Sequence, residues 1–216
     1  MTDASSEKPV IFVLAGVNGA GKSSLGGEFL RESGLVYYNP DEFAHRILDA
    51  THCSVEEANS IAWNEGHRRL AHAIDHRESF AFESTLSGVT MTSLLIRASP
   101  QFDVRVWFFG LATPEQHIRR VRERVARGGH DIPEETIRKR WIDARRNITR
   151  LLPHLSELRV FDNSAEADGP LGAIPPPRLL LHWNGGMVAG PGRAALIETP
   201  DWAREIVEAA LALEER

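Results

Sequence analysis

The sequence predicts an α/β fold, a three-layer sandwich built around a mainly parallel sheet. Short β-rich runs alternate with longer segments of helical character, which is the pattern of a parallel α/β sheet. The 216 residues, with hydrophobic and charged fractions of 42% and 25%, can bury a real core. We therefore expect one domain spanning residues 1–216, with a flexible N-terminus at residues 1–8.

The predicted strands are separated by predicted helices along residues 10–164. The expected strands are Val10–Ala15, Leu35–Tyr38, Ser79–Glu83, Val104–Gly110 and Leu158–Phe161. The expected helices are Lys22–Glu32, Asp41–Asp49, Val55–Arg77, Thr90–Ala98, Pro114–Arg127 and Glu134–Leu152. Because ligands of parallel sheets bind outside the carboxyl ends of the strands, we expect the functional site at that edge.

The pattern of residues 165–216 predicts a C-terminal β-hairpin followed by a helix. A Pro- and Gly-rich stretch first predicts an irregular connection. In order, the segments are the connection Ala165–Pro177, the strands Leu179–Trp183 and Met187–Ala189, and the helix Asp201–Leu213. Asn184-Gly185-Gly186 between the two strands is typical of a hairpin turn. We expect residues 178–216 to be an appendage of the same domain.

The composition limits the cellular context and the class of partner. A single cysteine, Cys53, cannot form an internal disulfide, which favours a reducing compartment. Residues 1–8 lack the basic-then-apolar order of a signal peptide, and no apolar run is long enough to span a bilayer. The net charge of −5 argues against general nucleic-acid binding. We expect a cytoplasmic protein with neither nucleic acid nor membrane as a partner.

One segment carries a strong phosphate-binding signal. Gly16–Ser23 fits G-x-x-x-x-G-K-[ST], the P-loop motif, and stands between a predicted strand and a predicted helix. Its glycines let the backbone form a nest of N–H donors around phosphates, while Lys22 reaches the β and γ phosphates and Ser23 offers its hydroxyl to Mg²⁺. The predicted nucleotide-binding residues are Gly16, Asn18, Gly19, Ala20, Gly21, Lys22, Ser23 and Ser24. The expected cofactors are ATP and Mg²⁺, with Ser23 as the metal ligand.

Acids at two strand ends favour a kinase over other P-loop proteins. A GTPase would carry the base-reading N-K-x-D, which the chain lacks, and the strand that ends at Gly110 lacks the terminal acid of a motor or transporter ATPase. Asp41 follows the second strand and Glu83 ends the third, so both are placed to activate an acceptor hydroxyl beside the phosphates. The alternatives are a helix N-cap for Asp41 and a solvated strand end for Glu83.

Positive charge is concentrated in residues 119–150. This window holds ten arginines and Lys139 against five acids, a net charge of +6, which leaves −11 on the rest of the chain. One interpretation is two helices with solvated charged faces. The other is a positive field directed at phosphates, because the arginine fork suits several oxygens at once. The P-loop favours the second interpretation.

Helical geometry shows which arginines of residues 119–150 lie next to an apolar helix face. At about 100° per residue, one apolar stripe runs through the second helix. Its members are Ile137, Trp141, Ala144, Ile148 and Leu151. Arg140 borders this stripe, whereas Arg124 and Arg127 flank and end the stripe of the preceding helix. Gly128-Gly129 then breaks the helix and can hinge a lid over the phosphates. The alternative for each arginine is a charged helix rim.

With these segments in place, the chain resembles the zeta-toxin family, including its short chromosomal members. The resemblance runs from about residue 10 to 164, and more loosely through the terminal hairpin and helix. It is carried by Gly16–Ser24, Asn39–Glu42, Phe82–Gly88, Arg124–Pro133, Ile137–Trp141 and Phe161–Ser164. The E-S-T-L-S-G and R-G-G-H-D-I-P segments are much more specific than the P-loop, which many families share.

The resemblance implies a P-loop kinase-like fold with a helical lid, and an ATP-dependent kinase that phosphorylates the amino sugar of UDP-N-acetylglucosamine. It implies that Asp41 is the general base, with Lys22 and Ser23 in their P-loop roles. Glu83 and Thr85 would contact the acceptor or organise Mg²⁺. Arg140, together with Arg124 or Arg127, would stabilise the transferred phosphoryl group. A further implied partner is an antitoxin protein.

The compact chain leaves the acceptor open, because larger zeta toxins carry more chain around the sugar-nucleotide pocket. Related P-loop proteins phosphorylate other nucleotides or cofactors, including a ribose hydroxyl of NAD. One alternative is therefore a kinase with another nucleotide or cofactor as its acceptor. The other is a P-loop NTPase that serves as a nucleotide-dependent switch or binding module.

Overall fold

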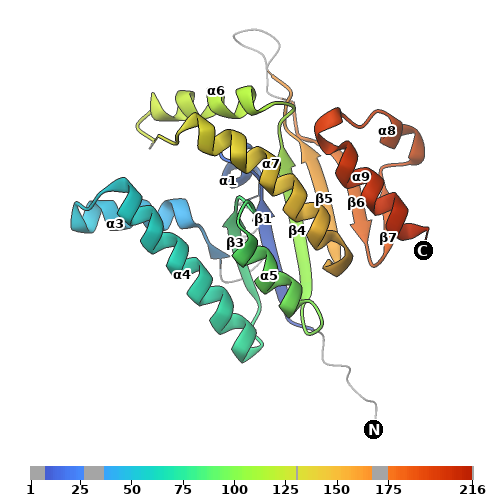
Figure 1. The fold of residues 1–216 in the computed structure, drawn as a ribbon, viewed down its shortest axis with the longest axis horizontal. Helices are drawn as coiled ribbons and strands as arrows, with labels where there is room; N and C mark the ends of the chain where they lie inside the picture. Colours follow the sequence, from blue (N-terminus) through green and yellow to red (C-terminus); the bar gives the residue numbers. More distant parts are fainter. Residues whose placement is uncertain (1–7, 27–36, 130, 167–174, 216) are drawn as a thin grey trace.

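The structure, a computed structural model, describes residues 8–26, 37–129, 131–166 and 175–215 (Figure 1). Within these residues one seven-stranded sheet has the order β2-β3-β1-β4-β5-β6-β7. The strands are β1 Val10–Ala15, β2 Tyr37–Tyr38, β3 Phe80–Ser84, β4 Asp103–Gly110, β5 Glu157–Asp162, β6 Arg178–Asn184 and β7 Met187–Gly190. The first five pair in parallel and the last two pair antiparallel, which confirms the predicted mainly parallel sheet.

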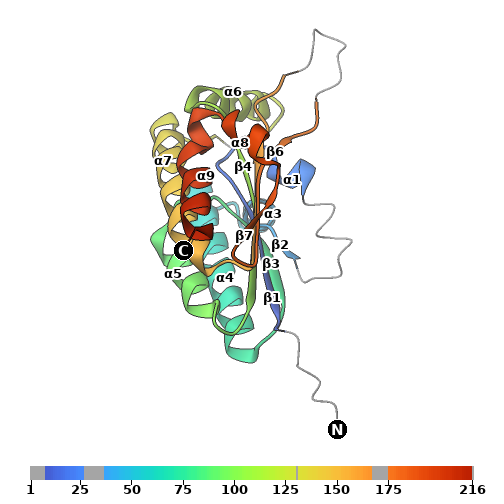
Figure 2. The same ribbon diagram turned by 90° about the vertical axis from the view of Figure 1, so that its right-hand side faces the viewer.

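Helices lie on both faces of this sheet. They are α1 Lys22–Leu25, α3 Pro40–Thr51, α4 Val55–His76, α5 Val89–Ala98, α6 Pro114–Val125, α7 Glu134–Leu151, α8 Arg193–Ile197 and α9 Asp201–Glu214, with a 3₁₀ turn η1 at Leu152–His154. Figure 2 shows α4, α5, α7 and α9 on one face and α1 on the other. None of the helices in the described ranges is long and apolar enough to cross a membrane.

The central strand β1 explains how the two faces are packed. It is almost wholly buried, and its side chains alternate between two apolar clusters with the period of two that a strand imposes. Ile11 and Val13 join the large cluster with α5, α7 and α9, whereas Phe12 and Leu14 join a smaller cluster on the opposite face. A strand buried on both faces reads as a continuous apolar run. Burying each such side chain contributes about 1.5–3 kcal/mol.

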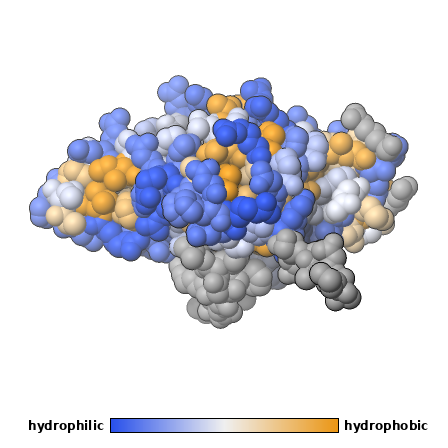
Figure 3. Space-filling model, turned by 90° about the horizontal axis from the view of Figure 1, so that it is seen from below, coloured by the Kyte–Doolittle hydropathy of each residue, from blue (hydrophilic) through white to orange (hydrophobic). Residues whose placement is uncertain are grey.

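The α3–α4 pair forms a separate small unit at one end of the molecule. Ala44 on α3 packs against Ala58 and Ala62 on α4 in a third apolar cluster. In Figure 3 hydrophobic side chains gather at the left end, where α3 and α4 lie in Figure 1, on a mostly hydrophilic face. This pair stands beside the carboxyl ends of β2 and β3 and forms one wall of the site described below.

The observed elements differ from the expected ones mainly at their ends. α6 stops at Val125 instead of Arg127, because the Gly129 N–H turns back to the Arg124 carbonyl and closes the helix. α8 was not expected, since only five residues form it. The hairpin extends the main sheet through the β5–β6 pairing. The predicted helix Lys22–Glu32, strand Leu35–Tyr38, N-terminus and irregular connection lie partly outside the described residues.

Candidate active site

The P-loop leaves β1 and passes very close to a neighbouring strand. Gly16 has φ +143°, and a Cβ there would lie 2.2 Å from the carbonyl oxygen of Phe109 on β4. Only glycine fits this position without moving the sheet. The loop then runs to Gly21, which caps α1, so Lys22 begins a helix as the sequence predicts.

The P-loop forms the floor of a cavity of about 960 Å³. α6 and the turn after it cover the loop, and the residues after β5 close one side. The cavity is lined by Asn18, Gly19, Gly21, Lys22, Ser23, Ser24, Asp41, Arg119, Arg120, Glu123, Arg124, Arg127, Gly128, Gly129, Asn163, Ala165, Glu166 and Pro175–Pro177. Arg124 and Arg127 therefore both reach this P-loop cavity, with Arg127 exposed at its rim.

Positive charge is concentrated around the P-loop lysine. Burial is the largest cause that holds the pKa of the Lys22 ammonium below its usual value, and the nearby Arg124 and Arg140 add to it. Glu83 and Asp41 act in the opposite direction. A set of cations held this close, partly out of water, is stabilised by an anion such as a polyphosphate.

Glu83 is the centre of a buried polar group and is only 5% exposed. Its Oε2 accepts a hydrogen bond from the Ser23 hydroxyl at 3.0 Å. Its Oε1 accepts from the Tyr37 hydroxyl and from Asn39 Nδ2, the latter at 3.2 Å. The alternative of a solvated strand end is therefore wrong, because three donors surround this carboxylate.

The Ser23 and Glu83 oxygens fit Mg²⁺, which is usually held by one or two carboxylates, hydroxyls and water together with substrate phosphates. Across the described ranges there is no group of three or more His, Cys, Asp or Glu residues that could hold a metal by itself. These residues thus fit an ion that would also bind phosphate oxygens, rather than an ion held by protein groups alone.

Asp41 is not the cap of its helix. Asn39 is the N-cap of α3, and its Oδ1 accepts from the backbone N–H groups of Asp41 at 2.9 Å and Glu42 at 3.2 Å. The N-cap alternative for Asp41 is therefore wrong. Its carboxylate instead lies 3.7 Å from Nη1 of Arg124 on α6, across the P-loop cavity. Asn39 was not predicted to be the cap, although Asn before Pro-Asp-Glu is a typical cap signal.

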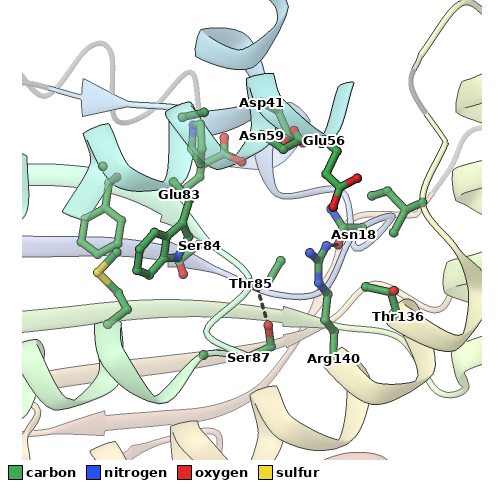
Figure 4. Close-up of a pocket in the computed structure, with 18 of the residues that line it drawn as sticks. Asn18, Asp41, Glu56, Asn59, Glu83, Ser84, Thr85, Ser87, Thr136 and Arg140 are labelled. Atoms are coloured by element: carbon green, nitrogen blue, oxygen red, sulfur yellow. Dashed lines mark hydrogen bonds between the residues drawn. The ribbon is translucent and has the colours of Figure 1, made fainter. Parts of the chain in front are cut away.

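A second cavity of about 780 Å³ adjoins the first (Figure 4). It lies between the α3–α4 pair and α7, at the carboxyl end of β3. Its lining includes Asn18, Pro40, Asp41, Glu56, Asn59, Trp63, Glu83, Thr85, Ser87, Met91, Asp131, Thr136 and Arg140. Asn18 and Asp41 line both cavities, so they stand where the two meet.

Polar and aromatic side chains give the second cavity its character. The hydroxyls of Thr85 and Ser87 lie 2.9 Å apart on the loop after β3. Asn147 of α7 donates to the Leu86 carbonyl at 2.8 Å and holds this loop, in which Leu86 has φ +51°. Trp63 on α4 is 49% exposed in this lining, and its ring is stacked with that of His67, with 5.6 Å between the centroids. This is a concave site with a few convergent polar groups.

Arg140 on α7 lies at the edge of the buried helix face, as the helical geometry predicts. Its Nη1 donates to Asn18 Oδ1 at 2.7 Å, so the side chain reaches from α7 to the P-loop (Figure 4). Burial holds the pKa of its guanidinium below the usual value, and Asp41 opposes this shift. The guanidinium is thus a partly desolvated cation in the second cavity, in contact with Asn18 where the two cavities meet.

Two side chains that the sequence analysis did not single out hold the P-loop from outside. His117 of α6 contacts the Asn18 carbonyl, and Asn163 after β5 contacts the Ala20 carbonyl. Asn163 stands in the Phe161–Ser164 segment that carries the family resemblance. His117 has no comparable sequence signal, because a histidine on a charged helix gives no indication of burial.

The comparisons with known proteins agree with this geometry. The family model described as Zeta toxin matches residues 1–168. The chain belongs to the zeta toxin family. No curated protein gives a significant match to it.

Solved structures share the fold of this zeta toxin family member. An AvrRxo1-ORF1:-ORF2 complex with ATP matches with a TM-score of 0.66 and 15% identity, over 96% of this chain and 77% of that chain. The PezAT chromosomal toxin–antitoxin system of Streptococcus pneumoniae matches with a TM-score of 0.50 and 12% identity, over 73% and 68% of the two chains. The Pnkp1/Rnl/Hen1 RNA repair complex matches with a TM-score of 0.53 and 19% identity, over 69% and 48%.

Family and fold together define the class of reaction. The chain is a kinase with a P-loop kinase-like fold. The family confirms the resemblance inferred from the sequence motifs, and phosphoryl transfer is the class of reaction that it supports.

Proposed function

We propose that the chain transfers the γ-phosphate of ATP to a hydroxyl of a small acceptor held in the second cavity. The observation that carries this proposal is the position of Asp41, which lines both the P-loop cavity and the second cavity. A hydroxyl in the second cavity and a γ-phosphate above the P-loop would meet beside this carboxylate. An acid at such a junction is suited to act as a general base.

The proposed step moves one proton and one phosphoryl group. The acceptor hydroxyl gives its proton to the Asp41 carboxylate while its oxygen forms a bond to the γ-phosphorus. The bond from that phosphorus to the β–γ bridging oxygen breaks, and ADP leaves with the electron pair. Lys22, Arg124 and Arg140 stabilise the charge that spreads over the phosphoryl oxygens. Arg127, at the rim, remains the alternative to Arg124 as the second lid arginine.

Ser23 and Glu83 are the residues proposed to hold Mg²⁺. When bound, the ion supplies positive charge that offsets the charge of the β and γ phosphates. The hydrogen bond from Ser23 to Glu83 holds the two oxygens 3.0 Å apart, within reach of one ion. Glu83 can also face the acceptor, since it lines the second cavity together with Thr85.

The family makes UDP-N-acetylglucosamine the first acceptor to examine. The second cavity has a volume typical of small-molecule sites, and the Trp63 ring could stack on a base or pack against a sugar. Another nucleotide or a dinucleotide cofactor remains the alternative acceptor. The PezAT match supports an antitoxin protein as a partner of this chain, and the cytoplasm is the proposed location.

The proposal is tested by incubating the protein with ATP, Mg²⁺ and a panel of sugar nucleotides and dinucleotides. Mass spectrometry should detect an acceptor that gains one phosphate while ADP forms in equal amount.

Lys22→Ala should abolish both ATP binding and transfer, because the ammonium that contacts the β and γ phosphates is lost. The Arg68→Ala variant is a matched control, since Arg68 is exposed on α4 and pairs only locally with Glu65. A Lys22→Ala protein that binds and consumes ATP like the parent would contradict the P-loop assignment.

A further inference from the structure

Two buried side chains bind carbonyl groups of the P-loop, those of Asn18 and Ala20. His117 Nδ1 lies 2.8 Å from the Asn18 carbonyl oxygen, and Asn163 Nδ2 donates to the Ala20 carbonyl oxygen at 2.9 Å. The two side chains are 0% and 8% exposed. We infer that His117 and Asn163 are positioning residues that fix the direction of two P-loop peptide planes for phosphate binding. This inference rests on the ATP site proposed above.

The reason lies in the rigidity of the peptide unit. In a planar trans peptide the C=O of one residue and the N–H of the next point in opposite directions. Because the Asn18 carbonyl is held toward His117, the Gly19 N–H turns away from His117, and because the Ala20 carbonyl is held toward Asn163, the Gly21 N–H turns away from Asn163. Gly19 and Gly21 both line the P-loop cavity. A phosphate-binding nest needs these N–H groups on its inner side.

The glycines of the P-loop make these two hydrogen bonds necessary, because they leave the loop backbone free to change direction. Gly19 and Gly21 have φ values of +82° and +87°, and glycine occupies either sign of φ at little cost. A peptide between such residues can turn over, which would present a carbonyl oxygen to the phosphates in place of an N–H donor. A side chain that binds the carbonyl outside the loop penalises this turn, because the buried donor would lose its partner.

The chemistry of His117 suits a fixed donor. A carbonyl only accepts, so Nδ1 carries the hydrogen, and the neutral ring then leaves Nε2 without one. Nε2 is buried without a hydrogen-bond partner among the described residues, which fits a bare nitrogen better than an N–H group. Burial, with Lys22 and Arg120 nearby, lowers the pKa of His117 to about 4. The ring is therefore neutral near pH 7 and holds the carbonyl without adding charge.

Asn163 is in turn fixed by its own surroundings. Its backbone N–H donates to the Gly110 carbonyl at 3.0 Å at the end of β4. Its carbonyl accepts from Arg120 Nη2 of α6 at 2.8 Å. α6 thus contacts the loop directly through His117, and it holds the second positioning residue through Arg120.

Two substitutions at His117 separate orientation from packing. His117→Asn keeps an N–H donor near the position of Nδ1 but removes volume, whereas His117→Leu keeps the volume and removes the donor. We expect His117→Leu to weaken binding of ATP and of tripolyphosphate about tenfold or more, and His117→Asn to weaken them by less than about threefold. Calorimetric titration with both probes measures the phosphate contacts with and without the nucleoside.

Asn163→Ala should weaken the binding of both probes about tenfold, because the Ala20 carbonyl loses its side-chain partner in the same way. This variant keeps the inference testable if His117→Leu does not fold.

A purely structural role predicts a different pattern, in which affinity follows the melting temperature of each variant. The control is Thr199→Val, which removes a buried hydroxyl bond to the Leu196 carbonyl far from the site and should lower stability without changing either affinity. Parental affinity for both probes in His117→Leu and Asn163→Ala would overturn the inference and leave the nucleotide site intact. A parent protein that binds neither probe would overturn the nucleotide site itself, and the inference with it.

Discussion

At the scale of single residues, the site depends on side chains that hold other groups in place. Asn39 caps α3 through its Oδ1 and binds Glu83 through its Nδ2, so one amide connects the helix that carries Asp41 to the strand that carries Glu83. Tyr37 donates to the same carboxylate. Such a group of buried polar atoms is stable only when every member has a partner. The Glu83 carboxylate and the start of the helix that carries Asp41 are therefore held in place before any ligand binds.

The buried imidazole of His117 predicts how stability depends on pH. Its pKa is lowered from 6.5 to about 4 in the folded protein, mainly by burial. Between these values the unfolded chain binds a proton that the folded protein does not, so the free energy of unfolding falls as pH falls through this window. The contribution of His117 to this fall should reach about 3 kcal/mol. Lys22 and Arg120 are the charged groups that add to the effect of burial.

The measurement is chemical denaturation of the parent and of His117→Asn at several pH values from 7 to 4. The variant has no titrating group at this position, so its stability should fall less steeply than that of the parent across this range. Other titrating groups contribute to both proteins and cancel in the difference. Parallel curves for the two proteins would show that His117 is not buried as a neutral ring.

At the scale of secondary structure, α6 and α7 bring arginine side chains to the P-loop and to Asp41. α6 carries Arg124 toward Asp41 at 3.7 Å, and α7 carries Arg140 to Asn18 at 2.7 Å. The glycines after α6 end that helix, and Gly128 has φ +94°. Both helices are strongly amphipathic, so their apolar stripes set their rotation and thereby the direction of these arginines.

Arg140→Ala should lower the rate of phosphoryl transfer about 100-fold while the affinity for ATP changes little. The guanidinium is placed to act on charge that develops during transfer, and a preorganised donor of this kind contributes most in the transition state. Steady-state kinetics with the acceptor found in the screen, together with calorimetric ATP binding, separates the two effects. The control is Arg138→Ala on the same helix, where the side chain is exposed and pairs with Glu115. Equal losses in ATP affinity and rate would make Arg140 a ground-state anchor instead.

At the scale of the whole molecule, the sequence predicts the sheet and the P-loop well because both depend on local patterns. The apolar run of β1 followed by glycines gives the strand and the loop, and the stripe on α7 gives the rotation that puts Arg140 beside Asn18. The burial of Glu83 and His117 could not be predicted, because it depends on contacts 46 and 99 residues away in the chain. α8 is too short for its pattern to be recognised.

The junction of the two cavities remains the central feature of the molecule, and Asp41→Asn tests it most directly. Asn39 provides the cap of α3, so the substitution keeps the helix and the size of the side chain while removing the proton acceptor. Transfer should fall about 10²–10⁴-fold, with ATP affinity and melting temperature close to those of the parent. Transfer at more than about a tenth of the parental rate would contradict Asp41 as the base and direct attention to Glu83.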